Sequence, residues 1–149
     1  MNELSNYINK INLDNIKLME EKAMEKELVI KKCKNCGSIV KVIKDCNCKD
    51  CGVKCCGDTM DKLVPNSVDA AVEKHVPNVE VIGDKIKVTV NHVMEDEHFI
   101  EWASCVTDKK ECTQYFKPGE EAVAEFEYVP GSKVYAYCNK HGLWSKKID

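Results

Sequence analysis

The sequence lacks three features that would place it in common protein classes. No apolar run approaches the roughly 20 residues that a membrane-spanning helix needs. Basic residues are not in excess, because 22 of them face 25 acidic ones and the net charge is −3; proteins held mainly by nucleic-acid phosphates usually carry a basic excess. Residues Met1–Ser5 have neither the positive region nor the apolar core of a secretory signal. We therefore expect a cytoplasmic protein that binds neither a membrane nor a nucleic acid.

Cysteine, in contrast, is abundant, with ten in 149 residues. In a secreted protein this content would indicate a disulfide scaffold, but in a chain without an export signal metal-bound thiolates fit better. Seven of the ten cysteines lie between Cys33 and Cys56. This segment is therefore the first candidate metal site.

Composition divides the chain into three segments. Residues 1–30 contain no glycine, proline or cysteine, and the spacing of their apolar residues predicts a helix, or a helical hairpin in which Asp14 caps the second helix. We interpret this extension as a solvated or packing segment, with an oligomerisation or partner helix as the alternative. Residues 31–66 are rich in cysteine, with a strand expected at Ser38–Ile43. Residues 67–149 have the pattern of an all-β domain.

Short strands separated by turns fill this third segment. The pair Gly83-Asp84 follows the apolar run Val79–Ile82 and is a signal for a two-residue hairpin turn. Alternating apolar residues then continue the pattern, at Ile86, Val88 and Val90 and in the segments Ala122–Tyr128 and Val134–Cys138, and Phe99–Val106 is another apolar stretch. Such regular spacing of strands and turns predicts a small β-sandwich.

The four histidines of the chain have informative neighbours. His141 lies three residues after Cys138, so that a turn at a strand end can bring a thiolate and an imidazole to one metal. His92 and His98 flank a polar loop between two expected strands, and His75 lies further upstream. Structural zinc takes four ligands and favours cysteine. Four imidazoles and one thiolate indicate a higher coordination number with an open sixth position, which suits iron.

Three separate motifs then carry a resemblance to a known family. They resemble superoxide reductase at Glu73–Pro77, His92–Trp102 and Tyr137–Trp144. The segment Cys33–Cys56 resembles desulforedoxin, and residues 31–149 together resemble desulfoferrodoxin, the two-centre form of superoxide reductase. The resemblance implies an immunoglobulin-like β-sandwich that follows a small module with four cysteines around a second iron ion.

The resemblance also implies roles for individual residues. Carried over from the family, one axial thiolate and four equatorial imidazoles surround the catalytic iron, namely Cys138 and His75, His92, His98 and His141. Lys74 would add positive charge at the open position and organise a proton-donating water, and Glu73 would bind ferric iron after turnover. Outside this motif, an exposed Glu-Lys pair is simply a solvated surface. Asn91–Met94 departs from the His-Pro-Met often found in the family, although the ligand itself is kept.

The cysteine-rich segment allows two pairings. Cys33-Lys34-Asn35-Cys36 presents two thiolates from one turn, and the desulforedoxin pattern completes the site with Cys55 and Cys56. Adjacent strand residues point to opposite faces, so both can bind one metal only where the chain bends, which Gly57 permits. The alternative joins Cys33 and Cys36 to Cys48-Lys49-Asp50-Cys51 in a zinc-ribbon spacing. We favour the first pairing, with iron or zinc as its metal.

Five cysteines remain outside the favoured sites. Cys46, Cys48 and Cys51 are interpreted as spare thiols, a second metal site of the module or a redox pair. Cys105 and Cys112 lie in the β segment, where we expect them to be buried as small hydrophobic residues.

The sequence thus favours a superoxide reductase of the desulfoferrodoxin type, which reduces superoxide to hydrogen peroxide. The resemblance implies a rubredoxin-like or flavin protein as electron donor, and a homodimer formed through the β domain and the small module. The expected domains are a helical extension (1–30), a desulforedoxin-like module (31–66) and a catalytic sandwich (67–149). The alternatives are a non-enzymatic iron electron carrier and a zinc-ribbon interaction module with a helical arm.

Overall fold

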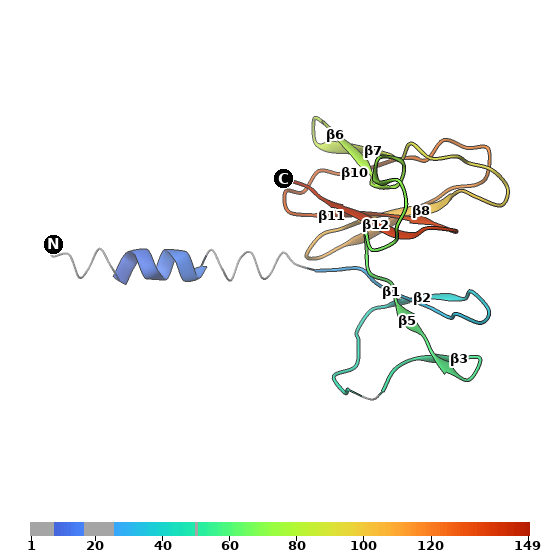
Figure 1. Cartoon of the computed structure of the whole chain (residues 1–149). Coiled ribbons are helices and arrows are strands. Elements are labelled where there is room, and N and C mark those ends of the chain that lie inside the picture. The colour runs from blue at the N-terminus through green and yellow to red at the C-terminus, as the bar shows by residue number, and fades with distance from the viewer. Residues whose placement is uncertain (1–7, 17–25, 50) are drawn as a thin grey trace.

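The computed structural model describes residues 8–16, 26–49 and 51–149. In Figure 1 a helix over residues 8–16 stands apart from a body of β-sheets. This helix continues through Asp14 without a break, so the expected helix cap at that residue is wrong. The rest of the expected helical segment, residues 1–7 and 17–25, lies outside the described residues. Residues 29 and 30, which the sequence placed in the extension, already belong to the first strand.

The elements of the body follow one another along the chain as short strands with one short helix. In order they are β1 (Val29–Lys32), β2 (Ile39–Val42), β3 (Lys54–Cys55), β4 (Asp58–Thr59), β5 (Asp61–Lys62), α2 (Val72–His75), β6 (Asn78–Ile82), β7 (Lys85–Thr89), β8 (Ile100–Val106), β9 (Glu111–Tyr115), β10 (Val123–Glu127), β11 (Lys133–Cys138) and β12 (Gly142–Lys147). No helix among the described residues is both long and apolar enough to cross a membrane.

Three antiparallel sheets are stacked as layers. The order of strands is β10-β7-β6 in the first, β12-β11-β8-β9 in the second and β2-β1-β5 in the third. Figure 1 shows the four-stranded sheet between the other two, with the hairpin of β3 and β4 at the far end of the small module. The first two layers form the predicted β-sandwich, which confirms the fold class.

The sandwich core follows the alternation that the sequence displays. Ile86 and Val88 on β7 and Ala124 on β10 point into the core and are buried. They pack with residues of the middle sheet, among them Val134 and Ala136 of β11. Burying alternate residues of each strand removes apolar surface from water at roughly 25 cal/mol per Å². The expected strands are thus confirmed, whereas β9 was missed because its residues are mostly exposed and do not alternate.

The other face of the middle sheet is buried by the small module. Tyr135 and Tyr137 of β11 point away from the sandwich and join a second core with Leu28 and Ile30. The backbone N–H of Leu28 donates a hydrogen bond to the hydroxyl of Tyr135 over 3.3 Å, and burial raises the pKa of that hydroxyl. The module is therefore packed on the sandwich, although its own sheet has only short strands.

Two ion pairs and a hydrogen bond between the small module and the sandwich reinforce this packing. Lys41 of β2 lies 3.0 Å from Glu111 at the start of β9, and Lys133 of β11 lies 3.0 Å from Glu27. The hydrogen bond from Lys133 and its charge hold the pKa of Glu27 below its usual range. Asn66, in the connection between the module and the sandwich, accepts a hydrogen bond from the backbone N–H of Ser145 in β12 over 2.9 Å.

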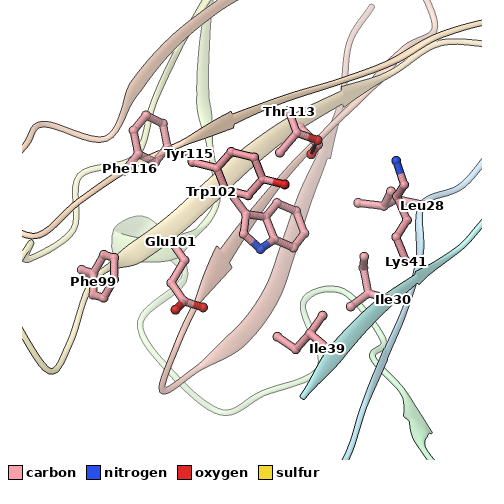
Figure 2. A pocket seen from close by; sticks show the side chains of 11 residues that line it. Leu28, Ile30, Ile39, Lys41, Phe99, Glu101, Trp102, Thr113, Tyr115 and Phe116 are labelled. Atoms are coloured by element: carbon pink, nitrogen blue, oxygen red, sulfur yellow. Dashed lines mark hydrogen bonds between the residues drawn. The ribbon is translucent and has the colours of Figure 1, made fainter. Parts of the chain in front are cut away.

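A pocket of about 460 Å³ lies between the small module and the middle sheet, on the side of β9. Figure 2 shows Ile30 and Ile39 on the module side of this pocket, facing Trp102 and Tyr115 of the middle sheet. Tyr115 is 73% exposed. The module is therefore packed closely against one part of the middle sheet and leaves an open pocket towards its β9 edge.

Replacing Ile30 with alanine tests whether the packing of the module contributes to stability. Ile30 is 3% exposed, so we expect the variant to lose about 2–5 kcal/mol of unfolding free energy. Denaturant titration followed by tryptophan fluorescence measures the loss. Ile43→Ala is the matched control because Ile43 is 89% exposed, and it should change stability by less than about 0.5 kcal/mol. Equal stability of the two variants would contradict this packing.

Candidate metal centres

Cys138 is fixed at the end of β11 by an irregularity in the neighbouring strand. Tyr137 lies opposite Trp102 of β8, but Cys138 lies opposite Ile100, so Glu101 is an extra residue in β8. Such bulges re-aim side chains next to functional sites. Here the bulge places apolar Ile100, instead of a carboxylate, opposite Cys138, and both side chains belong to the sandwich core. The thiol is therefore fully buried at one end of that core.

The hairpin between β11 and β12 brings His141 to this thiol. Cys138 is opposite Gly142, and the three residues between them form the turn. Gly142 has a φ of +77°, a conformation that favours glycine. The backbone N–H of His141 donates to the sulfur of Cys138 over 3.4 Å, and the Nδ1 atom of the same histidine lies 3.8 Å from that sulfur. The Cys-x-x-His spacing therefore does bring the two side chains together.

His75 is held by α2 and is buried. A carbonyl can only accept a hydrogen bond, so the contact of 2.7 Å between Nδ1 of His75 and the carbonyl of Ala71 places the proton on Nδ1. In the neutral ring the other nitrogen, Nε2, is then the one available to a metal ion, and it lies 3.0 Å from Nδ1 of His141. Trp144 supports both histidines, because its ring stacks on His75 and its Nε1–H donates to the carbonyl of His141 over 3.0 Å.

His98 follows a tight two-residue turn, in which Glu95 and His98 exchange both backbone hydrogen bonds. The side chain of Asn139 fastens this turn from both sides of the histidine. Its amide nitrogen donates to the carbonyl of Glu97 over 3.0 Å, and its amide oxygen accepts from the N–H of Phe99 over 3.0 Å. As a result, Nε2 of His98 is held 3.3 Å from Nδ1 of His141.

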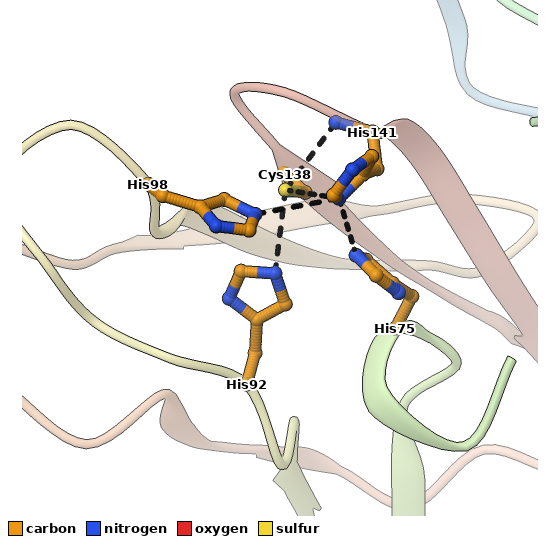
Figure 3. A group of neighbouring side chains, drawn as sticks. All are labelled: His75, His92, His98, Cys138 and His141. Carbon is orange, nitrogen blue, oxygen red and sulfur yellow. Dashed lines mark hydrogen bonds between the residues drawn. The ribbon is translucent and has the colours of Figure 1, made fainter. Parts of the chain in front are cut away.

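His92 completes the group from the loop after β7. Its Nδ1 contacts the carbonyl of Val93, which leaves Nε2 facing the sulfur of Cys138 at 3.4 Å. Figure 3 shows four rings and one thiol converging on a common point. One ligand atom from each lies within 4.8 Å of all the others, in the group His75, His92, His98, Cys138 and His141.

The chemistry of this group fits a single transition-metal ion. Burial, followed by the charges of neighbouring groups, lowers the pKa of His98, and burial lowers that of His92. Both imidazoles are therefore biased towards the neutral form that binds metals. Backbone carbonyls fix the ring orientations of His75 and His92, as is usual for histidine ligands. Neutral nitrogens with one soft sulfur suit iron better than the oxygen-binding cations.

Glu73 and Lys74 precede His75 on α2, and both are exposed. Lys74 and His92 line the same hollow, which has a volume of about 660 Å³. An ammonium group among the residues that line this hollow favours the approach of an anion. The roles expected of Glu73 and Lys74 remain predictions.

A second group of four thiols is built by two turns of the small module. β3 and β4 are joined by Cys56 and Gly57, whose φ angles of 52° and 81° are those of a two-residue hairpin turn. The bend that the sequence requires is therefore present, and Cys56 itself takes part in it. Cys55 lies 3.6 Å from Cys36 and 3.9 Å from Cys56, measured between sulfur atoms.

The first two cysteines come from a tight turn between β1 and β2. Hydrogen bonds from the backbone N–H groups of Cys36 and Asn35 lower the pKa of the Cys33 thiol to about 7. Shared hydrogen bonds with Cys36 and Cys33 raise the pKa of Cys55 to about 12. Four crowded thiols cannot all ionise without a cation, so this arrangement, too, is suited to a metal.

Three further expectations are settled by position. Cys48 and Cys51 lie in a separate group with Cys46, so the zinc-ribbon pairing with the first turn of the module is wrong. Cys105 is buried as expected. Cys112 is exposed, which corrects its expected burial, because it lies on the edge strand β9.

Sequence reasoning missed the residues that support the ligands. Asn139 and Trp144 lie within the motif Tyr137–Trp144 but were given no role. Their closeness in sequence to Cys138 and His141 was a signal that they could support these side chains. The extra residue Glu101 gave no signal, since a bulge depends on the register between strands and not on residue type.

Comparison with known proteins agrees with this geometry. A family model described as desulfoferrodoxin matches residues 67–147. A protein named desulfoferrodoxin from Syntrophotalea carbinolica is 41% identical over 128 residues, covering 83% of this chain and 99% of its own. Another of that name from Desulfarculus baarsii is 43% identical over 126 residues, covering 81% and 97%. The crystal structure of the superoxide reductase from Treponema pallidum matches with a TM-score of 0.62 at 28% identity, over 82% of this chain and all of that one.

Asn139→Ala tests the support of His98. We expect the affinity of the five-residue group for its metal to fall about 10–100-fold, because the turn that carries His98 loses both side-chain hydrogen bonds. Competition with a chelator measures the affinity. Asn139→Asp keeps the acceptor for the N–H of Phe99 and loses the donor, so its affinity should lie between those of the alanine variant and the wild type. An unchanged affinity in Asn139→Ala would contradict the role of this residue.

Proposed function

Because this chain belongs to the desulfoferrodoxin family, we propose that it is a superoxide reductase, an oxidoreductase that converts superoxide to hydrogen peroxide. The observation that carries the proposal is the convergence of five ligand atoms within 4.8 Å, in the group His75, His92, His98, Cys138 and His141. Iron bound there would supply the single electron that, together with two protons, turns superoxide into hydrogen peroxide. The likeness to the Treponema pallidum superoxide reductase supports the same reaction.

The charge of the ligands favours an anionic substrate. An imidazole binds a metal ion in its neutral form, so one thiolate among four imidazoles would compensate only one of the two positive charges of a divalent ion. The net positive charge that remains attracts an anion even though the whole chain has a charge of −3. Lys74 adds a further positive charge at the hollow that it shares with His92. We propose that Lys74 steers superoxide into this hollow and orients the water that donates a proton.

The surroundings of Cys138 adjust the electron density of its sulfur. The backbone N–H of His141 donates to this sulfur, and such a hydrogen bond would withdraw some negative charge from a metal-bound thiolate. The sulfur is also buried away from water, where such a hydrogen bond has more weight. We propose that Cys138 is the axial ligand, that the four histidines are equatorial, and that Glu73 occupies the open side after turnover.

The four-thiol group supports a role in electron delivery. We propose that residues 31–66 hold a second iron ion through Cys33, Cys36, Cys55 and Cys56, and that residues 67–149 form the catalytic domain. A rubredoxin-like or flavin protein is the proposed donor, and a cytoplasmic homodimer the proposed form.

Iron analysis with a visible spectrum tests the metal, since zinc thiolates are colourless and ferric thiolates absorb visible light. Light scattering tests the dimer.

Cys138→Ser tests the central assignment. We expect this variant to lose the thiolate-to-iron charge-transfer band of the catalytic centre and its turnover of superoxide, because a serine hydroxyl is not ionised at neutral pH and is a harder ligand. Pulse-generated superoxide on the pre-reduced protein measures the rate. Cys112→Ser is the control, since Cys112 is exposed on an edge strand and should leave both signals unchanged. Wild-type rate and spectrum in Cys138→Ser would refute the axial assignment.

Lys74→Ala tests electrostatic steering. We expect a slower second-order reaction with superoxide, most clearly at low salt, and a smaller difference at higher ionic strength, because the Debye length is about 8 Å at physiological salt. Lys147→Ala makes the same change in net charge at the open end of the β11–β12 hairpin, away from the turn that carries His141. There Lys147 lies opposite Lys133 in the strand register. This control should react like the wild type. Rates of Lys74→Ala that equal wild type at every salt concentration would remove Lys74 from the mechanism.

A further inference from the structure

Three cysteines lie together in a loop that belongs to neither metal centre. The loop connects β2 and β3 and extends away from the sheets of the small module (Figure 1). Its cysteines, Cys46, Cys48 and Cys51, are all exposed, and their sulfur atoms lie within 4.8 Å of one another. They form a group of their own, separate from the four thiols of the module.

Both ends of this loop are anchored. At its start, the carboxylate of Asp45 accepts hydrogen bonds from the ammonium of Lys31 and from the backbone N–H of Cys46, each over 2.9 Å. The side chain of Lys31 is mostly buried, so this contact ties the loop to β1. At its end, the carbonyl of Val53 accepts from the N–H of Met60, which is buried. Both ends of the loop are thus attached to the small module, while its three thiols face solvent.

Within the loop, Cys48 and Cys51 form a disulfide, with their Cα atoms 5.7 Å apart. This separation lies in the range that a disulfide spans without backbone movement. Cys46 remains a free thiol, and its sulfur contacts the carbonyl of Cys51 at 3.8 Å. A third thiol next to a disulfide can attack it, because exchange proceeds through a thiolate and a disulfide sulfur.

A purely structural role does not account for this disulfide. The stabilisation from a cross-link grows with the length of the loop that it closes, and this one closes only two intervening residues. All three cysteines are exposed, so the cross-link is not buried against a core. Exposed disulfides that are open to attack are the labile kind.

We propose that Cys46, Cys48 and Cys51 form a thiol–disulfide exchange site, which a protein dithiol of the thioredoxin class reduces and hydrogen peroxide re-oxidises. The peroxide would come from the reduction of superoxide, and only this part of the proposal rests on the proposed function. The site would therefore consume the product of the same protein. It lies outside both groups of proposed metal ligands, so it can react without displacing either metal.

Both halves of the cycle balance. In reduction, one thiolate of the partner attacks the Cys48–Cys51 bond to form a mixed disulfide, and the second partner thiolate releases it, leaving two thiols on this chain and a disulfide in the partner. In oxidation, one loop thiolate attacks peroxide, which breaks the O–O bond and gives a sulfenic acid and hydroxide. The hydroxide takes up the proton that the thiol had lost and becomes one water. A second loop thiol attacks that sulfenic sulfur, which re-forms the disulfide and releases a second water.

Cys46 has a distinct part in this cycle. Because its sulfur lies within 4.8 Å of both others, it can replace either one as disulfide partner. The site should therefore tolerate the loss of one thiol. Replacing Cys48 should leave a disulfide between Cys46 and Cys51, whereas replacing Cys46 should leave the disulfide between Cys48 and Cys51.

The test uses the metal-loaded full chain. The protein is reduced with dithiothreitol, freed of it, treated with one equivalent of added hydrogen peroxide, alkylated and analysed by peptide mass spectrometry. We expect the loop peptide of the wild type to carry two fewer alkyl groups than before peroxide, and dithiothreitol to restore them. Cys48→Ser should show a Cys46–Cys51 disulfide, and Cys112→Ser, the matched exposed control, should behave like the wild type.

Two results would overturn the proposal. One is a loop whose three thiols are all still alkylated after peroxide treatment. The other is a stoichiometric metal ion that is lost from the triple variant Cys46→Ser, Cys48→Ser, Cys51→Ser, which would make the loop a third metal site. Because peroxide is added directly, neither result depends on superoxide reduction, and a failure of the proposed function would instead appear in the superoxide assay alone.

Discussion

The strand β11 is buried on both faces, and this constraint determines where everything else lies. Its residues alternate between the sandwich core, which receives Val134, Ala136 and Cys138, and the second core, which receives Tyr135 and Tyr137. A shift of register by one residue would exchange these sets and bury both tyrosines in the wrong layer. The thiol of the catalytic centre and the surface that carries the small module are therefore fixed by the same strand.

The remaining ligands reach Cys138 from segments that are far apart in sequence. α2, the loop after β7 and the turn before β8 each deliver one histidine, and each is fastened locally by backbone hydrogen bonds. Asn139 then connects the turn of His98 to the β11–β12 hairpin. The protein's own hydrogen bonds thus help to set the ring orientations, as is usual for histidine ligands. This explains why the ligands come from loops and yet converge closely.

The sequence was informative where a residue type and its spacing determine the outcome. Alternating apolar residues identified β7, β10 and β11, because half-buried strands require a period of two. The five candidate ligands were identified because three motifs resemble those of superoxide reductase, and the structure brings these five side chains together. The edge strand β9 was missed, and the expected burial of Cys112 was wrong. Both errors have one cause, since the exposure of an edge strand follows from the order of strands in the sheet. The bulge at Glu101 and the hydrogen bonds of Asn139 to the turn before β8 depend on how distant segments align. A local sequence pattern does not contain this information.

The small module uses cysteine in two ways, and local geometry separates them. Cys36, Cys55 and Cys56 are held by tight turns with sulfur atoms 3.6 and 3.9 Å apart, well beyond the ~2.05 Å of a disulfide bond. This spacing suits thiolates around one metal ion. Cys48 and Cys51 are exposed in the segment between β2 and β3, where a disulfide joins them. The same residue type is therefore directed to metal binding or to disulfide chemistry by the backbone that presents it.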